Sequence, residues 1–415
     1  MNDSGSSNRR LASTVYLDHA ASTPMYAAAV AAMTCQLSQA GNASSLHASG
    51  RAARRVVEES RETIAAALGA RPGEVVFTSG GTEADNLAVK GLYWARRAED
   101  PRRTRILSTA VEHHAVLDPL HWLEAATGPA GPPADVELLP VDETGRLRVD
   151  ALAAAIERDP ASVALVSVMW ANNEVGTVQP IAEVVALAHQ HGIPVHTDAV
   201  QAAGHVPVDF AATGVDALSL TGHKLGGPLG VGALLVRREV EVAPLLHGGG
   251  QERDLRSGTV DAAGVAGLAA AVQRATATLP QEASRVAALR DDLVRRVLAR
   301  VPDAALNGPG PEERLPGNAH LTFPGCEGDS LLMLLDAQGI ECSTGSACSA
   351  GVPQASHVLL AMGRSEEAAR ASLRFSLGHT TDASDVDTLV EAIAPAVERA
   401  RAAGLASGLG ARAVS

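Results

Sequence analysis

Short apolar runs alternate with amphipathic segments along most of the chain. The runs that read as buried strands are residues 75–78, 105–109, 136–139, 163–169, 193–197, 216–220 and 231–236. The Ala-rich segments between them that show helical character are residues 82–97, 112–126, 150–158 and 180–191. Strands that alternate with helices are typical of a parallel sheet covered by helices. The last two runs flank a Gly-rich turn, so we expect a hairpin or an antiparallel strand there.

The pattern changes near Pro280. Val286, Leu289, Leu293 and Val297 recur at spacings of three and four, which indicates one face of a long helix. The three residues at 279–281 (Leu-Pro-Gln) read as a break between two domains.

The remaining segments predict a smaller α/β domain. They comprise strand-like runs at 318–323 and 372–377, a helix at 329–338 and a helix from about residue 384. Pro395 should bend this last helix. We therefore expect an α/β chain in which a large domain with a mostly parallel sheet spans 22–278. A small domain spans 279–415, and an N-terminal arm at 1–21 joins it.

Composition and charge exclude several kinds of function. The 415 residues carry 47 acidic and 34 basic side chains, a net charge of −13, which argues against nucleic-acid binding as the main function. Aromatic residues make up 2% of the chain, too few for a base-stacking platform. The four cysteines form no CxxC pair, so a structural zinc site is not expected. With no long apolar run and no secretory leader pattern, the expected compartment is the cytoplasm.

Polar clusters follow five of the predicted strands. They are residues 79–83 (SGGTE), 112–114 (EHH), 172–174 (NNE), 198–201 (DAVQ) and 221–224 (TGHK). Ligands of open α/β sheets bind at the carboxyl ends of the strands. A capped loop explains any single cluster, but five in succession predict one shared crevice.

The first cluster has the character of a phosphate site. Gly80 and Gly81 permit close backbone approach, and Thr82 leads into a helix whose N-terminus favours an anion. The segment lacks the Gly-Lys-Ser/Thr of a P-loop and the GxGxxG pattern. Many ordinary helices also begin at a Gly-Thr turn, so this signal is weak alone.

Lys224 is the more informative residue, because the chain contains only two lysines. Lys90 falls in the middle of a predicted helix, where a surface amine is the default, whereas Lys224 lies in a Gly-rich turn. Such an amine suits Schiff-base chemistry. Together with a phosphate site and Asp198 after a buried strand, it points to pyridoxal phosphate, whose ring nitrogen Asp198 would keep protonated. A helix N-cap is the alternative for Asp198.

Three further residues carry candidate chemistry. His113 follows a strand, where it could stack on a cofactor or act as an acid or base, or simply be a core histidine. Arg374 lies inside a predicted strand and could bind a substrate carboxylate or form a structural ion pair. Cys348 lies among small residues, which is typical of an exposed loop with a potential nucleophile.

The other three cysteines read as structural. Cys35 falls in an amphipathic helix and Cys326 in a turn, and for both the favoured interpretation is a small buried hydrophobe. Cys342 stands at the end of the run 339–341 (Gly-Ile-Glu) and also reads as structural.

Ten motifs in order resemble those of the cysteine desulfurases of the NifS/IscS kind, in the class V aminotransferase group of fold-type I pyridoxal-phosphate enzymes. The motifs are YLDHAAST (16–23), GNASSLH (41–47), FTSGGTEADNLAVKG (77–91), EHHAVLD (112–118), NNEVGTVQPI (172–181), HTDAVQ (196–201), TGHKLGGPLGVG (221–232), HGGGQERDLRSGT (247–259), STGSAC (343–348) and RFSLG (374–378). The resemblance runs from about Tyr16 to about Val397.

The resemblance implies a role for each matching position. Lys224 would bind pyridoxal phosphate covalently, Asp198 would pair with the ring nitrogen and His113 would stack on the ring. The other implied cofactor contacts are Gly81, Thr82, Thr221, His223, Asn173, Gln201 and, from the partner of a homodimer, Thr259. Arg374, with Asn42 or Asn173, would hold the substrate carboxylate. Lys224 would move the Cα proton, and Cys348 would accept the sulfur.

The implied reaction converts L-cysteine to L-alanine and leaves a persulfide on Cys348. The sulfur would pass to acceptor proteins of iron–sulfur cluster assembly or tRNA thiolation. A selenocysteine lyase or another class V enzyme such as an aminotransferase is the near alternative, and a sulfur-carrier or scaffold protein that lost catalysis is the distant one. Thr221 stands where the family usually has serine, and the C-terminal tail differs from the scaffold-docking tail of IscS-like enzymes.

Overall fold

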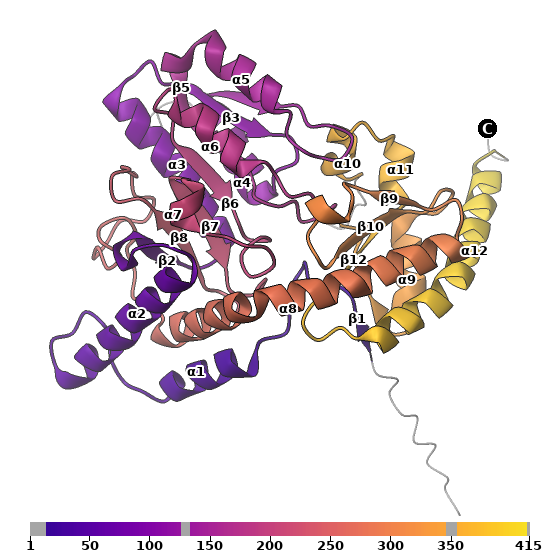
Figure 1. Cartoon of the computed structure of the whole chain (residues 1–415), viewed down its shortest axis with the longest axis horizontal. Coiled ribbons are helices and arrows are strands. Elements are labelled where there is room, and N and C mark those ends of the chain that lie inside the picture. Colours follow the sequence, from indigo (N-terminus) through magenta and orange to yellow (C-terminus); the bar gives the residue numbers. More distant parts are fainter. Residues whose placement is uncertain (1–13, 126–132, 346–354, 413–415) are drawn as a thin grey trace, which may run out of the picture.

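The computed structural model describes residues 14–125, 133–345 and 355–412, which form an α/β protein (Figure 1). A seven-stranded sheet runs in the order β2-β8-β7-β6-β5-β3-β4. Its strands are β2 (Val75–Thr78), β3 (Arg105–Thr109), β4 (Asp135–Leu139), β5 (Val163–Ser167), β6 (Val195–Asp198), β7 (Ala217–Thr221) and β8 (Gly232–Val236). The strands β4, β3, β5, β6 and β7, which are neighbours in that order, pair in parallel. Strand β8 is antiparallel to both of its neighbours, β7 and β2. The predicted parallel sheet and the antiparallel pair at its end are confirmed.

Helices cover both faces of this sheet because its strands are apolar on both sides. Along β2, Val76 belongs to one buried cluster, and Val75 and Phe77 belong to another. The first cluster includes residues of α3 (Gly81–Glu99) and α4 (His114–Ala125). The second includes residues of α5 (Val149–Arg158), α6 (Ile181–His189), α7 (Phe210–Thr213) and α8 (Ala262–Arg300). Successive strand residues point to opposite faces, so each face has its own helical layer.

Helix α8 crosses the segment where a break was expected. It runs for 39 residues, Ala262–Arg300, and includes Pro280, so the segment 279–281 that reads as a break between domains lies inside one helix (Figure 1). A proline inside a helix loses one backbone hydrogen bond. Here both halves of the helix are anchored by burial, with Leu268 in the core of the large sheet and Leu293 in the core of the small one. The division of the chain into two domains near residue 279 stays a prediction.

A smaller antiparallel sheet in the order β12-β10-β9 has its own core. Its strands are β9 (Ala305–Asn307), β10 (Asn318–Thr322) and β12 (Ser372–Ser376). Helices α9 (Gly328–Asp336) and α12 (Ala383–Arg412) contribute to this core, and α12 continues through Pro395. The N-terminal strand β1 (Val15–Tyr16) pairs in parallel with β11 (Ile340–Glu341), so the start of the described chain is tied to this part of the molecule.

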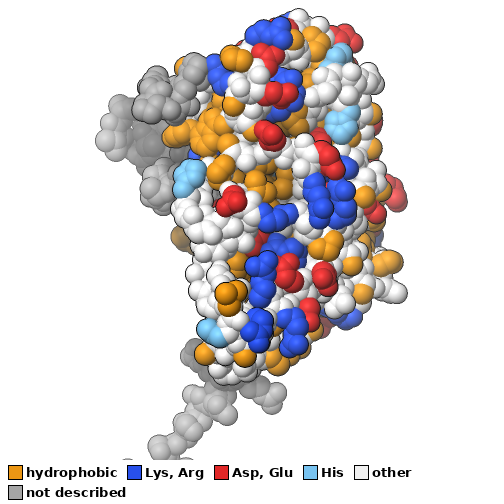
Figure 2. Space-filling view, turned by 90° about the vertical axis from the view of Figure 1, so that its left-hand side faces the viewer, with side chains coloured by type: hydrophobic (Ala, Val, Ile, Leu, Met, Phe, Trp, Pro, Cys, Tyr) orange, Lys and Arg blue, Asp and Glu red, His pale blue; other side chains and the backbone are white. Residues whose placement is uncertain are grey.

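The other described α-helices are α1 (Ala27–Leu37), α2 (Ala48–Ala67), α10 (His357–Ala361) and α11 (Glu366–Arg370). Of these, α1 and α2 pack against α8. Among the described residues, no helix is both long and apolar enough to cross a membrane. On the face seen in Figure 2, Lys and Arg side chains are interspersed with Asp and Glu.

Candidate active site

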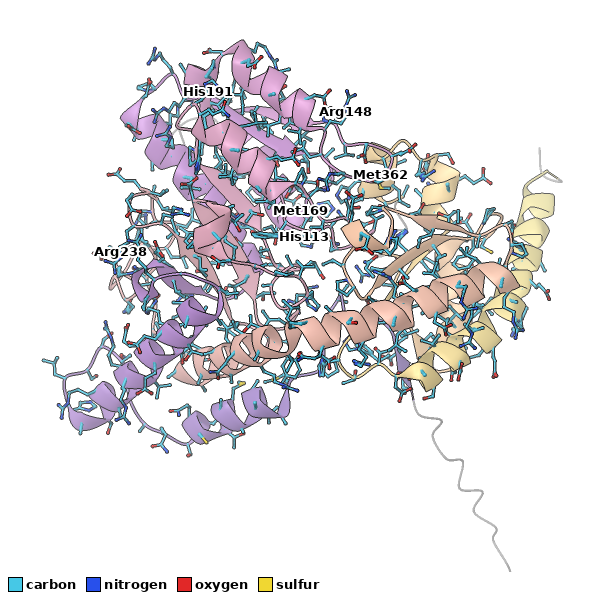
Figure 3. The ribbon with its side chains drawn as sticks, in the orientation of Figure 1. His113, Arg148, Met169, His191, Arg238 and Met362 are labelled. Carbon is cyan, nitrogen blue, oxygen red and sulfur yellow. The ribbon has the colours of Figure 1, made fainter. Side chains whose placement is uncertain are left out.

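A cavity of about 370 Å³ opens at the carboxyl edge of the large sheet. The N-terminal arm closes one side of it with Ala20 and Ala21, and the small sheet contributes Arg374. The residues expected at the site that line this cavity are Gly81, Thr82, His113, Asn173, Asp198, Gln201, Thr221, His223, Lys224 and Arg374. Figure 3 labels two lining residues, His113 and Met169, between the two sheets.

The turn before α3 is held in a conformation that suits an anion. Gly80 has φ 150°, and a Cβ at Gly81 would lie 2.8 Å from a side-chain carbon of Val200, so both positions favour glycine. Glu83 accepts a hydrogen bond from the Ser79 N–H over 2.7 Å and pairs with Arg256 over 2.8 Å. The N-terminus of α3 therefore faces the cavity in a fixed position, with the partial positive charge that attracts phosphate.

Lys224 follows β7 and reaches across to the N-terminal arm. Its Nζ donates hydrogen bonds to the backbone oxygens of Ala20, at 2.5 Å, and Ala21, at 2.8 Å. Burial, followed by the charge of Arg374, lowers the pKa of Lys224 to about 8. Much more of this amine is therefore neutral, and so nucleophilic, near pH 7 than in an exposed lysine.

Asp198 lies at the end of β6, buried beside the cavity. Its Oδ1 accepts a hydrogen bond from the Val200 N–H over 2.8 Å. Burial raises the pKa of Asp198 to about 6, and the charge of Lys224 opposes that rise. Within the described ranges, no basic side chain forms an ion pair with Asp198. Its carboxylate is therefore free to pair with a cationic group in the cavity.

Three more side chains line the cavity at this edge of the sheet, and hydrogen bonds fix the first two. The His113 Nδ1 accepts a hydrogen bond from the Ala115 N–H over 3.0 Å, and burial lowers the pKa of His113 to about 4, so its ring is neutral near pH 7. Gln201 donates from Nε2 to the Ala20 oxygen over 2.8 Å. His223 Nδ1 is buried without a hydrogen-bond partner in the described structure, which leaves it available to a ligand.

Arg374 joins three parts of the chain at the rim. From β12, its Nη1 donates to the Asn173 oxygen over 3.0 Å, and its Nη2 donates to Asp18 Oδ1 over 2.8 Å. Its Nε is buried and has no partner among the described atoms. An unpaired guanidinium N–H beside the cavity suits a carboxylate ligand.

Two predicted site residues lie elsewhere in the single chain. Asn42 is exposed between α1 and α2, where its side chain accepts from the Ser44 N–H over 2.9 Å. Thr259 is exposed just before α8. Neither lines the cavity among the described residues. The position of Thr259 on the surface is compatible with the expectation that it serves a partner subunit.

The cysteines divide differently from the expectation. Cys348 lies outside the described residues, although Ser343 and Gly345, which precede it, line the cavity. Cys326 is buried, as expected. Cys35 is exposed, so its predicted burial is wrong in the single chain.

Sequence reasoning missed several lining residues. Asp85 is a buried carboxyl at the cavity, and His357 lines it from α10. Asp85 had a recognisable signal, because it falls among the apolar positions Ala84 and Ala88 that form the buried face of α3. A carboxyl on such a face requires a polar environment at that point.

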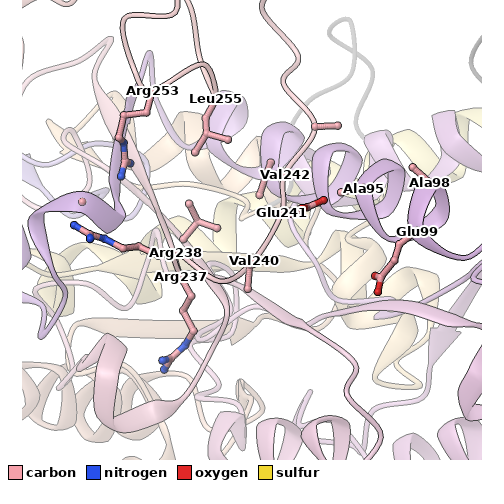
Figure 4. Close-up of a pocket in the computed structure, with 13 residues that line it drawn as sticks. Ala95, Ala98, Glu99, Arg237, Arg238, Val240, Glu241, Val242, Arg253 and Leu255 are labelled. Atoms are coloured by element: carbon pink, nitrogen blue, oxygen red, sulfur yellow. The ribbon is translucent and has the colours of Figure 1, made fainter.

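A larger cavity lies away from the sheet edge. It has a volume of about 930 Å³ and lies between α3 and the segment after β8 (Figure 4). Arg237, Arg238 and Arg253 contribute to its lining, but none of the described residues around it is one of the predicted site residues. The smaller cavity is the candidate active site, because the predicted groups converge there.

Known proteins resemble the chain over nearly its full length. The family model of the class-V aminotransferases matches residues 15–389. An IscS-like cysteine desulfurase of Mycobacterium tuberculosis is 58% identical over 392 residues, which cover 94% of this chain and 98% of the relative. A solved NifS-like protein has a TM-score of 0.84 and 33% identity, covering 93% of this chain and 99% of its own. The structure of SspA in complex with cysteine has a TM-score of 0.76 and 35% identity, covering 88% and 99%.

Proposed function

Because the chain belongs to the class-V aminotransferase family, we propose that it is a cysteine desulfurase that converts L-cysteine to L-alanine and moves the sulfur onto Cys348. The observation that carries this proposal is the convergence of Lys224, Asp198 and His113 with the N-terminus of α3 in one cavity. The names of the relatives and the cysteine bound to SspA support the choice of substrate.

Pyridoxal phosphate is the cofactor of this family, and the residues of the cavity fit it. The N-terminus of α3, with Gly81 and Thr82, suits the phosphate, to which Thr221 and His223 are adjacent. Asp198 is a buried carboxylate without a basic partner in the described structure, which suits a protonated ring nitrogen. The neutral ring of His113 suits stacking, and Asn173 and Gln201 suit the remaining polar edge of the cofactor.

When bound, the cofactor supplies an electron sink that makes the Cα proton of an amino acid removable. Asp198 contributes by holding a proton at the ring nitrogen. Lys224 lies at the cavity and its amine has a lowered pKa, so it would act as the base that takes the Cα proton. Arg374 orients the substrate through its carboxylate, with Asn173 beside it.

Cys348 completes the sulfur transfer in this proposal. Its thiolate attacks the sulfur of the substrate, so an S–S bond forms while the bond between that sulfur and Cβ breaks. Cys348 retains the sulfur as a persulfide, and the carbon skeleton takes up protons and leaves as L-alanine. The segment that carries Cys348 begins at the cavity, where Ser343 and Gly345 are lining residues.

The proposed partners follow from this chemistry. A persulfide is passed on by attack of an acceptor thiol, so we infer acceptor proteins of iron–sulfur cluster assembly or tRNA thiolation in the cytoplasm. We also propose a homodimer in which Thr259 reaches the phosphate of the partner's cofactor. Leu37, Leu46 and Leu229 support it, because these apolar side chains are 70%, 89% and 74% exposed in the single chain.

Three measurements test the activity. The purified protein should show a visible absorbance band from the cofactor bound to Lys224, and Lys224→Ala should abolish this band. L-cysteine with a reductant should yield sulfide and L-alanine. Cys348→Ser should keep the band but lose sulfide release, whereas Cys35→Ser, which removes an exposed thiol on α1, should release sulfide normally.

The outcomes separate the alternatives. Full turnover of cysteine by Cys348→Ser would rule out the persulfide step. Release of selenide from L-selenocysteine with no sulfide from L-cysteine would instead identify a selenocysteine lyase. Transfer of the amino group to a keto acid would identify an aminotransferase.

A further inference from the structure

Asp85 is a buried carboxyl of the cavity that the proposed reaction does not use. It lies in the second turn of α3, where its side chain is 1% exposed, and it lines the cavity together with Asp198. Its Oδ1 is buried and has no hydrogen-bond partner among the described atoms. A buried oxygen without a partner is costly if it carries a full negative charge.

The described groups around Asp85 offer no cation to balance such a charge. The Nε2 of His196 lies 3.6 Å from Asp85 Oδ1, but burial lowers the pKa of His196 to about 3, so its ring is neutral. Both nitrogens of that ring already have hydroxyl partners, with Ser167 at 2.9 Å from Nδ1 and Ser219 at 3.0 Å from Nε2. Ser219 also hydrogen-bonds the Asp85 side chain.

A third carboxyl completes the buried cluster. Glu112 is fully buried, and its Oε1 accepts from the Thr109 hydroxyl over 2.8 Å and from the Met169 N–H over 2.9 Å. Its Oε2 has no partner in the described structure. Burial raises the pKa of Glu112 to about 8, with the charge of Asp198 adding to the shift.

Within the part of the chain that the structure describes, Asp198 alone of these three carboxyls is acted on by a positive charge. The charge of Lys224 opposes the rise that burial causes in the pKa of Asp198, whereas burial, followed by the charges of Asp198 and Glu112, raises the pKa of Asp85. Neighbouring carboxyls in a buried site cannot all ionise, because like charges repel strongly at low dielectric. The charge therefore settles on Asp198, and the protons remain on the other two carboxyls.

We propose that Asp85 is a positioning residue of the cofactor site, a carboxyl that stays neutral and so leaves the negative charge of the cluster on Asp198. The inference rests on the proposed function only for the role of Asp198 as the partner of the ring nitrogen. A neutral Asp85 can donate a hydrogen bond towards the cluster, and an ionised Asp85 would instead compete with Asp198 for the single charge.

Infrared spectroscopy of the cofactor-free protein at pH 7 tests the protonation state. The wild-type protein should show carbonyl absorption from protonated carboxyls, and Asp85→Asn should lose one component that Glu112→Gln retains. Asp135→Asn, which changes an exposed carboxyl of β4, should leave the absorption unchanged. Absence of protonated-carboxyl absorption from the wild type, or its full retention in Asp85→Asn, would overturn the proposal.

Cofactor affinity separates a positioning role from a merely structural one. Asp85→Leu removes the donor that a neutral Asp85 offers to the cluster, and it should weaken the binding of pyridoxal phosphate about tenfold or more, because a hydrogen bond to a charged group contributes about 1.5 kcal/mol or more. Asp85→Asn keeps a donor and should bind within about threefold of wild type. Equal weakening in both variants would contradict the proposal. If the protein released no sulfide from cysteine, the proposed function would fail, but the infrared result would still decide the state of Asp85.

Discussion

The guanidinium of Arg374 donates a hydrogen bond to the carboxylate of Asp18 over 2.8 Å. Arg374 belongs to the small sheet, and Asp18 belongs to the N-terminal arm, so the contact fixes the rim of the cavity where two distant segments meet. A second hydrogen bond, to the Asn173 oxygen, sets the plane of the guanidinium. Asp18 thereby orients the group that we expect to hold the substrate carboxylate.

Removal of Asp18 should therefore weaken substrate binding. Asp18→Ala should raise KM for L-cysteine about tenfold and change kcat little, since a hydrogen bond to a charged group contributes about 1.5 kcal/mol. Steady-state kinetics of Asp18→Ala and of the wild-type protein measure KM and kcat. As a control, Asp303→Ala removes an exposed carboxylate that pairs with Arg401, and its KM should match the wild type. An unchanged KM in Asp18→Ala would show that Arg374 needs no orienting partner.

The pair of Arg61 and Glu252 should be important for stability. Glu252 is buried and accepts two hydrogen bonds from Arg61, both at 2.8 Å, and a third from the Phe77 N–H at 2.9 Å. Glu252→Ala removes the buried carboxylate and leaves the Arg61 guanidinium with only the half-exposed Glu58, at 3.2 Å, and the Val75 oxygen, so the free energy of unfolding should fall by about 3–5 kcal/mol. Urea denaturation of the protein measures the change.

An exposed ion pair provides the matched control for this stability test. Glu366 pairs with Arg370 on the surface of α11, and Glu366→Ala should cost about 0.5 kcal/mol. A loss of similar size in Glu252→Ala would contradict the assigned role of the buried pair.

Cofactor uptake should depend on pH through Lys224. Burial and the charge of Arg374 lower the pKa of this amine to about 8, and only the neutral amine attacks an aldehyde. The rate at which cofactor-free protein acquires its visible band should therefore rise with pH and level off above about 8. Stopped-flow absorbance follows the rate, and Lys90→Arg should give the same profile. A rate that keeps rising towards pH 10 would indicate an unperturbed lysine.

Cys326 and Cys342 should both be unreactive towards alkylation in the folded protein. Burial raises the pKa of Cys342 to about 12 and also raises the pKa of Cys326. Because the thiolate is the reactive form, iodoacetamide at pH 8 should leave both unmodified in the native Cys348→Ser protein. Peptide mass mapping reads the sites, and denatured protein, in which both should react, is the control. Rapid alkylation of Cys342 in the folded protein would contradict its burial.

Charged substitutions at the exposed leucines test the proposed homodimer. Leu46 and Leu229 are 89% and 74% exposed, so Leu46→Asp or Leu229→Asp should not disturb the core of one chain. Each should shift the protein from dimer to monomer in light scattering, because a charge would be buried at the interface. Met333→Asp, at an exposed position on α9, should remain dimeric. A wild-type protein that is monomeric would overturn the assignment of Thr259 to a partner.

Local sequence patterns determined most of the secondary structure and the place of the site. The runs at 75–78 and 105–109 coincide with β2 and β3, because both strands are buried on both faces and therefore lack the alternation of apolar and polar residues that a half-exposed strand shows. The polar clusters after the strands converge at the cavity, since the carboxyl ends of parallel strands share one edge. Asp198 was identifiable for this reason, and Lys224 also because it is one of only two lysines and lies in a Gly-rich turn.

Only the tertiary structure decided the relationships between distant segments. Three such relationships are the pairing of β1 with β11, the contact of Arg374 with Asp18 and the grouping of Asp85 with Asp198. Each joins residues that are far apart in the sequence, and no local pattern predicts that they meet. Pro280 shows the same limit of local sequence patterns, because the residues around it predict a break between two domains. Burial of both halves of α8 in two different cores outweighs the loss of one backbone hydrogen bond, and that balance depends on the whole fold.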